Sequence, residues 1–204
     1  AEIRIGAAWR IRIGDRAEGF RDLRVEAHPR NDPDPAPDGT NVSVKKTWKI
    51  GVLGPHVCTE AQRKLGLEVG AGIAEKGALL VCGGLGGMME AAAEGAKKAG
   101  GETLGILPGN DAADANPFID RALPTGLGPA RNLLVVRSCD AVIAIYGGYG
   151  TLTEIAFALR LDIPVVGLKT WSLVNNGSVD AGIHVAQNSK EAVELAFRLA
   201  RGPR

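Results

Sequence analysis

Residues 146–154, Tyr-Gly-Gly-Tyr-Gly-Thr-Leu-Thr-Glu, have the residue types and spacing that best fit an anion-binding site in this chain. The apolar run before them, residues 140–145, predicts a buried strand. The i, i+3, i+4, i+7 apolar spacing that follows predicts a helix over 151–161. A glycine-rich junction of this kind aims free backbone N–H groups and the positive end of a helix at one point. The chemistry that it predicts is phosphate binding.

Four residues of this junction are the predicted phosphate contacts. Gly147, Gly148 and Gly150 let the backbone approach a ligand closely, and Thr151 adds a hydroxyl donor. A tight strand–helix turn without a ligand would use the same glycines, so both interpretations stay open at this point. No Gly-Lys-Ser/Thr string follows, which excludes a Walker A loop.

Glu154 and Arg131 are the candidate catalytic residues. Thr151 and Glu154 have the spacing of a capping box, in which the carboxylate accepts the N–H of Thr151. Alternatively the carboxylate faces a crevice from the first helical turn, where it binds sugar hydroxyls or acts as a general acid or base. Arg131 lies near the start of a predicted helix over 128–137, and it either extends to solvent or clamps a phosphate or carboxylate.

A second glycine junction, Gly-Gly-Leu-Gly-Gly over 83–87, follows a predicted strand over 78–82 and precedes a predicted helix over 88–99. Its N–H groups can also contact a phosphate. No acidic residue follows at the spacing of a dinucleotide ribose site, which argues against NAD. This junction and the end of a predicted strand over 49–53 add the predicted nucleotide contacts Gly83, Gly84, Gly86, Gly87, Met88 and Gly54.

The elements that must position these residues alternate along the chain. From Lys46 onward, short strands that are apolar throughout alternate with helices, which is the pattern of a parallel sheet covered on both faces. We therefore expect an α/β fold with a Rossmann-like, doubly wound sheet over residues 46–204. The glycine breaks should converge in a crevice at the carboxyl ends of its strands. Residues 1–45 are a predicted N-terminal extension, with alternating strand patterns at 3–5 and 10–13 and a Pro/Asp-rich linker over 29–39.

The composition argues against several classes of function. The 204 residues carry a formal net charge of +1 and 4% aromatic residues, which disfavours duplex and single-stranded nucleic acids as ligands. No apolar stretch approaches the roughly 20 residues of a membrane-spanning helix, and no secretory leader is recognisable. The three cysteines and three histidines lack metal-ligand spacing, so we expect no metal site and a reducing, cytoplasmic location.

Together these motifs resemble one family, the nucleotide-binding proteins once labelled possible lysine decarboxylases. The family includes cytokinin-activating nucleoside-monophosphate phosphoribohydrolases and molybdenum cofactor carrier proteins. The resemblance spans residues 48–200. It rests on the order and spacing of four strings, which are Gly83–Glu90, Gly105–Pro108, Arg131-Asn132 and Gly147–Glu154.

The resemblance implies two alternative functions. A carrier would bind the molybdenum cofactor or a similar pterin nucleotide. A phosphoribohydrolase would cleave the N-glycosidic bond of a nucleoside 5′-monophosphate without a cofactor, with Glu154 and Arg131 in its catalytic positions. Tyr146 stands where the hydrolases have proline, and Asn132 where they usually have lysine, so the chain resembles the carriers more closely. No pyridoxal-phosphate lysine site supports a decarboxylase, and the homodimers common in the family imply a homo-oligomer.

Overall fold

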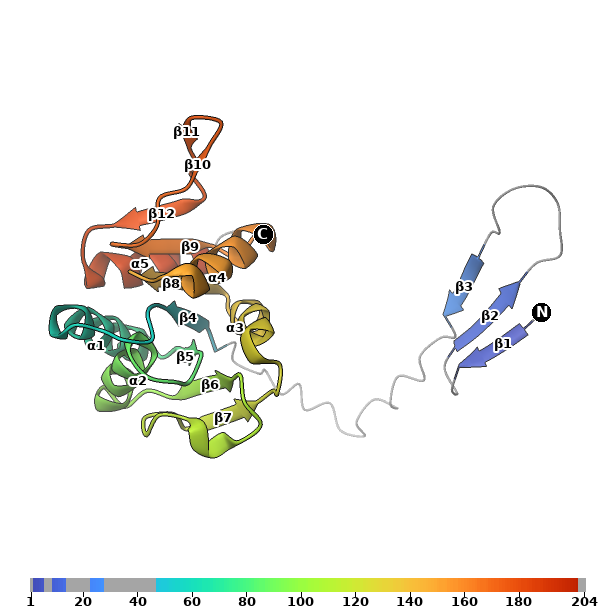
Figure 1. Cartoon of the computed structure of the whole chain (residues 1–204), viewed down its shortest axis with the longest axis horizontal. Helices are drawn as coiled ribbons and strands as arrows, with labels where there is room; N and C mark the ends of the chain where they lie inside the picture. Colours follow the sequence, from blue (N-terminus) through green and yellow to red (C-terminus); the bar gives the residue numbers. More distant parts are fainter. Residues whose placement is uncertain (1, 6–8, 14–22, 28–46, 202–204) are drawn as a thin grey trace, which may run out of the picture. The chain divides into compact units, whose positions relative to one another are not determined.

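The chain divides into two units, Ala1–Lys45 and Lys46–Arg204. The computed structural model describes residues 2–5, 9–13, 23–27 and 47–201 (Figure 1). In the first unit, β1 (Glu2–Ile5), β2 (Trp9–Ile13) and β3 (Leu23–Ala27) form an antiparallel sheet with β2 in its centre. The predicted strand segments at 3–5 and 10–13 lie in β1 and β2, whereas the predicted linker over 29–39 lies outside the described residues.

The second unit is built on a seven-stranded sheet in which all neighbouring strands are parallel. Its order is β12-β9-β8-β4-β5-β6-β7. The central strands β4 and β8 are buried almost throughout, because helices cover both faces. The bounds of the seven strands are β4 (Lys49–Leu53), β5 (Leu79–Cys82), β6 (Thr103–Leu107), β7 (Arg121–Pro124), β8 (Ala141–Ile145), β9 (Val165–Leu168) and β12 (Ile183–Ala186).

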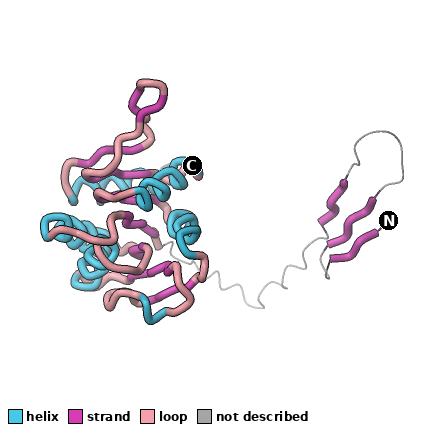
Figure 2. The backbone as a smooth tube through the Cα atoms, viewed as in Figure 1, coloured by secondary structure: helices cyan, strands magenta, loops and turns pink. Residues whose placement is uncertain are grey.

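Five helices form the two outer layers (Figure 2). On one face α1 (Glu60–Glu75), α2 (Met88–Lys98) and α5 (Ser189–Ala200) pack over one apolar cluster of the sheet. On the other face α3 (Asn132–Arg137) and α4 (Tyr149–Arg160) pack over a second cluster. The predicted doubly wound, Rossmann-like fold is therefore confirmed. Within the described part of the chain no helix is long and apolar enough to span a membrane.

The strand order places a topological switch point between β4 and β8. From β4 the chain moves outward through β5, β6 and β7, and then returns to the opposite side of β4 to build β8, β9 and β12. The connections that leave the carboxyl ends of β4 and β8 diverge at such a point and leave a crevice between them. Gly54 and Tyr146 are the first residues of these two connections.

Several elements differ from the sequence-based expectation. The predicted helix over 128–137 consists of a 3-10 turn, Gly128–Arg131, followed by the short α3. The edge strand β7 was not predicted, because its residues alternate between exposed and half-buried positions and it ends in Pro124. The hairpin of β10 (Val174–Asn175) and β11 (Ser178–Val179) was also not predicted, because its strands are two residues long and exposed.

Helices α1 and α2 approach each other closely through glycine, and this contact yields a stability prediction. A Cβ at Gly70 would overlap the carbonyl oxygen of Ala92, which is backbone and cannot move aside. Gly70→Ala should therefore destabilise the protein by roughly 1–3 kcal/mol, despite the higher helix propensity of alanine. The measurement is the free energy of unfolding in urea.

Gly72→Ala, on the same helix, is the matched control. Its Cβ would lie 3.2 Å from a side-chain methyl group of Val193, which can shift. We expect Gly72→Ala to stay within about 1 kcal/mol of the wild type. Equal losses from the two variants would contradict the argument from backbone overlap.

Candidate functional site

Three loops meet at the switch point. A Cβ at Gly54 would lie 2.8 Å from the carbonyl oxygen of Ile145, so the loops after β4 and β8 are in contact there. The backbone N–H of Met88, at the start of α2, donates to the carbonyl of Pro55 at 3.0 Å and ties the third loop, residues 83–87, to the first. The three glycine breaks thus converge at the carboxyl edge of the sheet, as the strand pattern predicted.

Met88 supports this junction from the core. Its side chain is fully buried beneath Gly54, and its N–H is used by Pro55. The ligand contact predicted for Met88 stays a prediction, since its buried side chain packs in the core and its N–H is already paired.

The helix after β8 begins two residues earlier than predicted. Gly148 is the N-cap of α4, in an extended conformation, and Tyr149, Gly150 and Thr151 form the first turn. The N–H groups of a first turn have no carbonyl partner within the helix, so they are available to an anion. Gly147 precedes them with φ of 113°, a conformation that a residue with a side chain rarely adopts, and the Thr151 side chain fills the space that a Cβ at Gly147 would need.

The early helix start removes the capping-box interpretation of Glu154. A capping box pairs the N-cap with the third residue of the helix, and in α4 these are Gly148 and Thr151. Glu154 instead lies in the second turn, where its side chain is buried at 8% exposure. The capping prediction is therefore wrong, and Glu154 does not lie in the first turn either. The helix propensity of glycine is low, which hid the true start at Gly148–Gly150.

Arg131 is the other buried charge of the site. It ends the 3-10 turn before α3, is 7% exposed, and lies against Gly83, where a Cβ would overlap its guanidinium. Its Nε and Nη1 atoms are buried and make no hydrogen bond with any described residue. The sequence left open whether the Arg131 side chain extends to solvent or turns toward the site, and in the structure it turns inward. Unpaired buried donors are costly, so they mark a place where an oxygen-rich group can bind.

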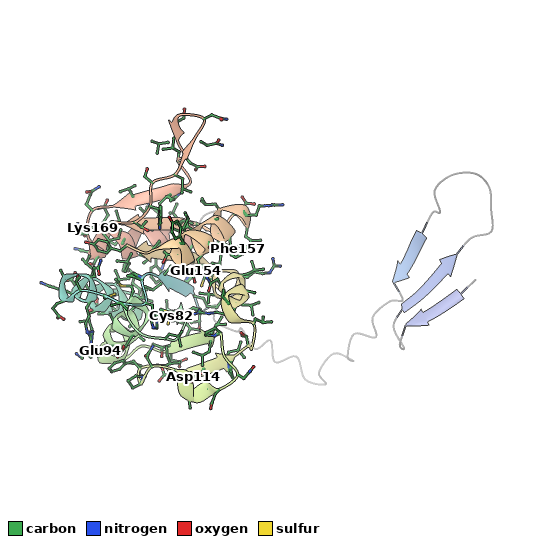
Figure 3. All side chains as sticks on the ribbon, viewed as in Figure 1. Cys82, Glu94, Asp114, Glu154, Phe157 and Lys169 are labelled. Carbon is green, nitrogen blue, oxygen red and sulfur yellow. The ribbon has the colours of Figure 1, made fainter. Side chains whose placement is uncertain are left out.

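Glu154 and Arg131 influence each other's ionisation across the site. Burial raises the pKa of Glu154 to about 7, and the nearby positive charge of Arg131 only partly opposes this shift. Cys82, at the end of β5, is near enough to both charges to be influenced by them, and burial raises the pKa of its thiol to about 11 (Figure 3). At neutral pH the site therefore holds a guanidinium, a carboxyl group that can give or take a proton, and a neutral thiol.

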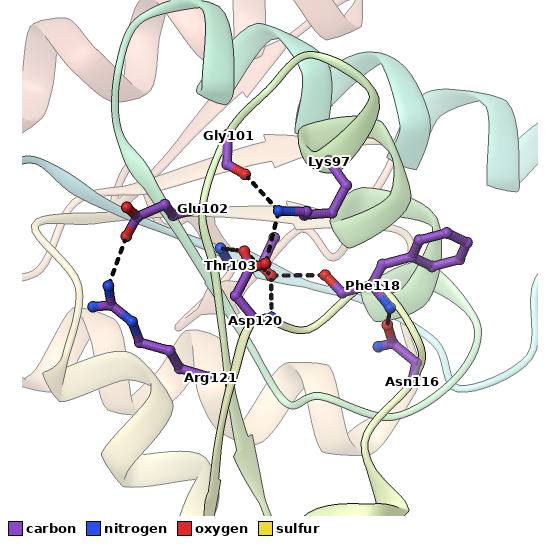
Figure 4. A network of polar contacts seen from close by, with 8 residues as sticks. All are labelled: Lys97, Gly101, Glu102, Thr103, Asn116, Phe118, Asp120 and Arg121. Atoms are coloured by element: carbon purple, nitrogen blue, oxygen red, sulfur yellow. Dashed lines mark hydrogen bonds and ion pairs between the residues drawn. The ribbon is translucent and has the colours of Figure 1, made fainter.

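The loop over residues 83–87 is held from the side by a residue that the sequence did not indicate. Asn116 donates its Nδ2 to the carbonyl oxygens of Gly84 and Leu85, at 3.1 and 2.9 Å, and is nearly buried. A polar network around Thr103 and Asp120 fixes the connection that carries it (Figure 4). The Asn-Pro pair within a polar loop is a turn signal, but nothing in it pointed to a glycine loop 32 positions away.

The remaining predicted contacts belong to the loops after β4 and β5. Gly84 and Gly87 have left-handed conformations, and a Cβ at Gly86 would lie in ordinary contact with the ring of His56. His56 is exposed in the loop after β4, whereas His184 is exposed on β12. No group of three or more His, Cys, Asp or Glu residues within the described residues could hold a metal ion.

A family comparison agrees with this arrangement. The family model described as the SLOG cluster4 family matches residues 47–194, which include all three loops, Arg131 and Glu154. The chain belongs to the SLOG cluster4 family. Residues 1–46 lie outside the match.

Two relatives are similar in sequence. An uncharacterized protein of Archaeoglobus fulgidus is 43% identical over 152 residues, which cover 74% of this chain and 96% of the relative. The cytokinin riboside 5′-monophosphate phosphoribohydrolase of Mycobacterium tuberculosis is 30% identical, over 69% of this chain and 84% of that enzyme.

Two solved structures are similar in fold and sequence. The molybdenum cofactor binding protein of Rippkaea orientalis superposes with a TM-score of 0.69 at 36% identity, over 76% of this chain and 98% of its own. The molybdenum cofactor carrier protein of Chlamydomonas reinhardtii superposes with a TM-score of 0.68 at 35% identity, over 77% and 100%. Both branches of the predicted family are thus among the relatives of this chain.

The raised pKa of Glu154 predicts how stability depends on pH. Because the folded-state pKa of about 7 lies above the ordinary value of 4.5, the folded protein binds the proton more tightly than the unfolded chain does. Stability contributed by the protonated form is therefore lost as pH rises from 4.5 through 7. Between pH 5 and pH 8 the wild type should lose up to about 3 kcal/mol relative to Glu154→Gln, measured by urea unfolding.

The same substitution at Glu75, which is exposed at the end of α1, is the control. Glu75→Gln should follow the wild type across this pH range. A constant difference between wild type and Glu154→Gln from pH 5 to pH 8 would show that Glu154 titrates normally.

Proposed function

We propose that this protein binds a phosphorylated, nucleotide-like cofactor at the switch point and acts as a molybdenum cofactor binding or carrier protein. The observation that carries the proposal is the buried Arg131 guanidinium, whose Nε and Nη1 have no partner among the described residues. These buried donors favour an oxygen-rich group such as a phosphate, because arginine forms strong charge-assisted hydrogen bonds with such groups.

Each predicted contact has a role in this proposal. Gly147, Gly148, Gly150 and Thr151 bind the phosphate through the free N–H groups and positive end of α4. Glu154 accepts hydrogen bonds from the hydroxyl or N–H groups of the ligand. The remaining predicted contacts, Gly54, Gly83, Gly84, Gly86 and Gly87, offer backbone groups to the ligand, and Met88 supports their loops from the core.

The relatives support the cofactor-carrier form of the proposal. The similar structures from Rippkaea orientalis and Chlamydomonas reinhardtii are described as a molybdenum cofactor binding protein and a molybdenum cofactor carrier protein. The chain covers nearly their whole length, so the resemblance includes the region of the crevice. The proposal also includes a cytoplasmic location and a homo-oligomer. Light scattering after size-exclusion chromatography would measure the mass of the oligomer.

The alternative function is a nucleoside 5′-monophosphate phosphoribohydrolase. It is favoured by the proximity of Arg131 and Glu154 and by the similarity to the Mycobacterium tuberculosis enzyme. Against it stands Tyr146, which has φ of 50° at the position where the hydrolase motif has proline. A proline is fixed near −65° and could not adopt this conformation, so the loop enters the site differently here.

The binding proposal predicts the effect of replacing Arg131. Arg131→Lys keeps the positive charge but loses the planar pair of donors, so affinity for the ligand should fall about 10-fold or more. Fluorescence titration with molybdopterin released from a molybdoenzyme, and separately with AMP, would measure it. Arg137→Lys, at the exposed end of α3, is the control and should bind like the wild type. Failure of the wild type to bind either compound would overturn the proposal.

Incubation with AMP separates the two functions. A phosphoribohydrolase should release adenine, detected by chromatography, and Glu154→Gln should reduce the rate at least about 100-fold if Glu154 stabilises charge at the anomeric carbon. A carrier should bind without release. Adenine release by the wild type, lost in Glu154→Gln, would replace the carrier proposal by the hydrolase.

A further inference from the structure

The segment that follows β9 holds the loop that follows β8 through hydrogen bonds. The N–H of Tyr146 donates to the carbonyl of Leu168 at 3.2 Å, which continues the ladder between β8 and β9. Beyond it, the Thr170 hydroxyl donates to the carbonyl oxygen of Tyr146 at 2.5 Å, and the Trp171 indole Nε1 donates to the carbonyl oxygen of Gly148 at 3.3 Å. Side chains of two successive residues therefore hold two carbonyls of residues 146–151, the proposed phosphate loop.

The conformation of Tyr146 needs such support. Its φ of 50° lies in the left-handed region, which is unfavourable for a residue with a side chain. Such conformations persist only where the surrounding structure enforces them, and they gather at ligand sites. The hydroxyl of Thr170 bonds the carbonyl of this very residue, so it stabilises the strained conformation directly.

The geometry of the peptide bond determines where the N–H groups after these two carbonyls point. In a trans peptide the carbonyl of one residue and the N–H of the next point in opposite directions. Because Thr170 holds the Tyr146 carbonyl on the β9 side, the N–H of Gly147 points away from β9. The sheet order places β9 and β4 on opposite sides of β8, so this direction leads toward the crevice. The same reasoning applies to Gly148, whose carbonyl also accepts the N–H of Leu152 and so directs the N–H of Tyr149 out of the helix start.

We propose that Thr170 and Trp171 are positioning residues of the phosphate loop: they hold the Tyr146 and Gly148 carbonyls away from the anion site so that the following N–H groups face the bound anion. This inference rests on the proposed function, since it assumes that the loop binds an anion. An aromatic contact reinforces the grip, with the ring of Trp171 5.9 Å from that of Tyr149 in the first turn of α4. Neither residue touches the ligand, and both act through the backbone that they hold.

The test uses inorganic phosphate as the probe and the backbone amide signals of Gly147 and Tyr149 in nuclear magnetic resonance spectra as the readout. Thr170→Val removes the hydroxyl but keeps the shape, and it should weaken phosphate binding about 3- to 10-fold, with little change in the melting temperature. Thr170→Ser keeps a hydroxyl and should restore most of the affinity. Trp171→Phe, which keeps a ring and loses the N–H, should weaken binding to a similar extent.

Thr153→Val is the matched control. The Thr153 hydroxyl also donates to a backbone carbonyl of α4, that of Tyr149 at 2.9 Å, but from within the helix and at an exposed position. Phosphate binding by Thr153→Val should equal that of the wild type. Unchanged binding in Thr170→Val, or equal weakening in Thr170→Val and Thr153→Val, would overturn the proposal.

A ligand-free measurement separates this inference from the proposed function. Crystal structures of the wild type and Thr170→Val should differ in the orientation of the peptide between Tyr146 and Gly147. An identical orientation in the two would overturn the positioning role, whatever the ligand proves to be. A wild type whose Gly147 and Tyr149 signals do not respond to phosphate would instead count against the anion loop of the proposed function.

Discussion

A guanidinium buried against a glycine is the interaction on which the site depends. Arg131 reaches the crevice only because Gly83 has no side chain, and a methyl group there would displace the guanidinium. Its position in turn partly offsets the cost of burying Glu154, whose pKa would otherwise rise further. Arg131 thus links the turn before α3 to the loop after β5 by packing and to the second turn of α4 by its attraction for Glu154.

Much of this arrangement could be predicted from the sequence, because apolar periodicity reports burial directly. The strand at 49–53 matches the prediction at both ends, since its residues are mostly apolar and a glycine follows it. The convergence of the three glycine breaks followed from the parallel order alone. β7 and the β10–β11 hairpin were missed because their residues face solvent, where the hydrophobic signal is weak.

The chemistry of single residues was less predictable than the fold. The spacing Thr151-x-x-Glu154 matched a cap, yet the helix began at Tyr149 because glycines can enter a first turn when the loop before them directs the chain. The inward turn of Arg131 depends on Gly83, 48 positions away, and the role of Asn116 depends on a carbonyl 32 positions away. Contacts of this range follow from the folded sheet and leave no local pattern.

The reactivity of Cys82 reports how often the protein opens beneath the crevice. Its thiol is fully buried behind Arg131, accepts the N–H of Gly84 and remains protonated at neutral pH because burial raises its pKa to about 11. A thiol in this state reacts with an alkylating reagent only when the loop over residues 83–87 lifts from the sheet and admits solvent. The rate of its modification therefore equals the opening rate of the site under conditions where the reagent acts faster than the loop closes.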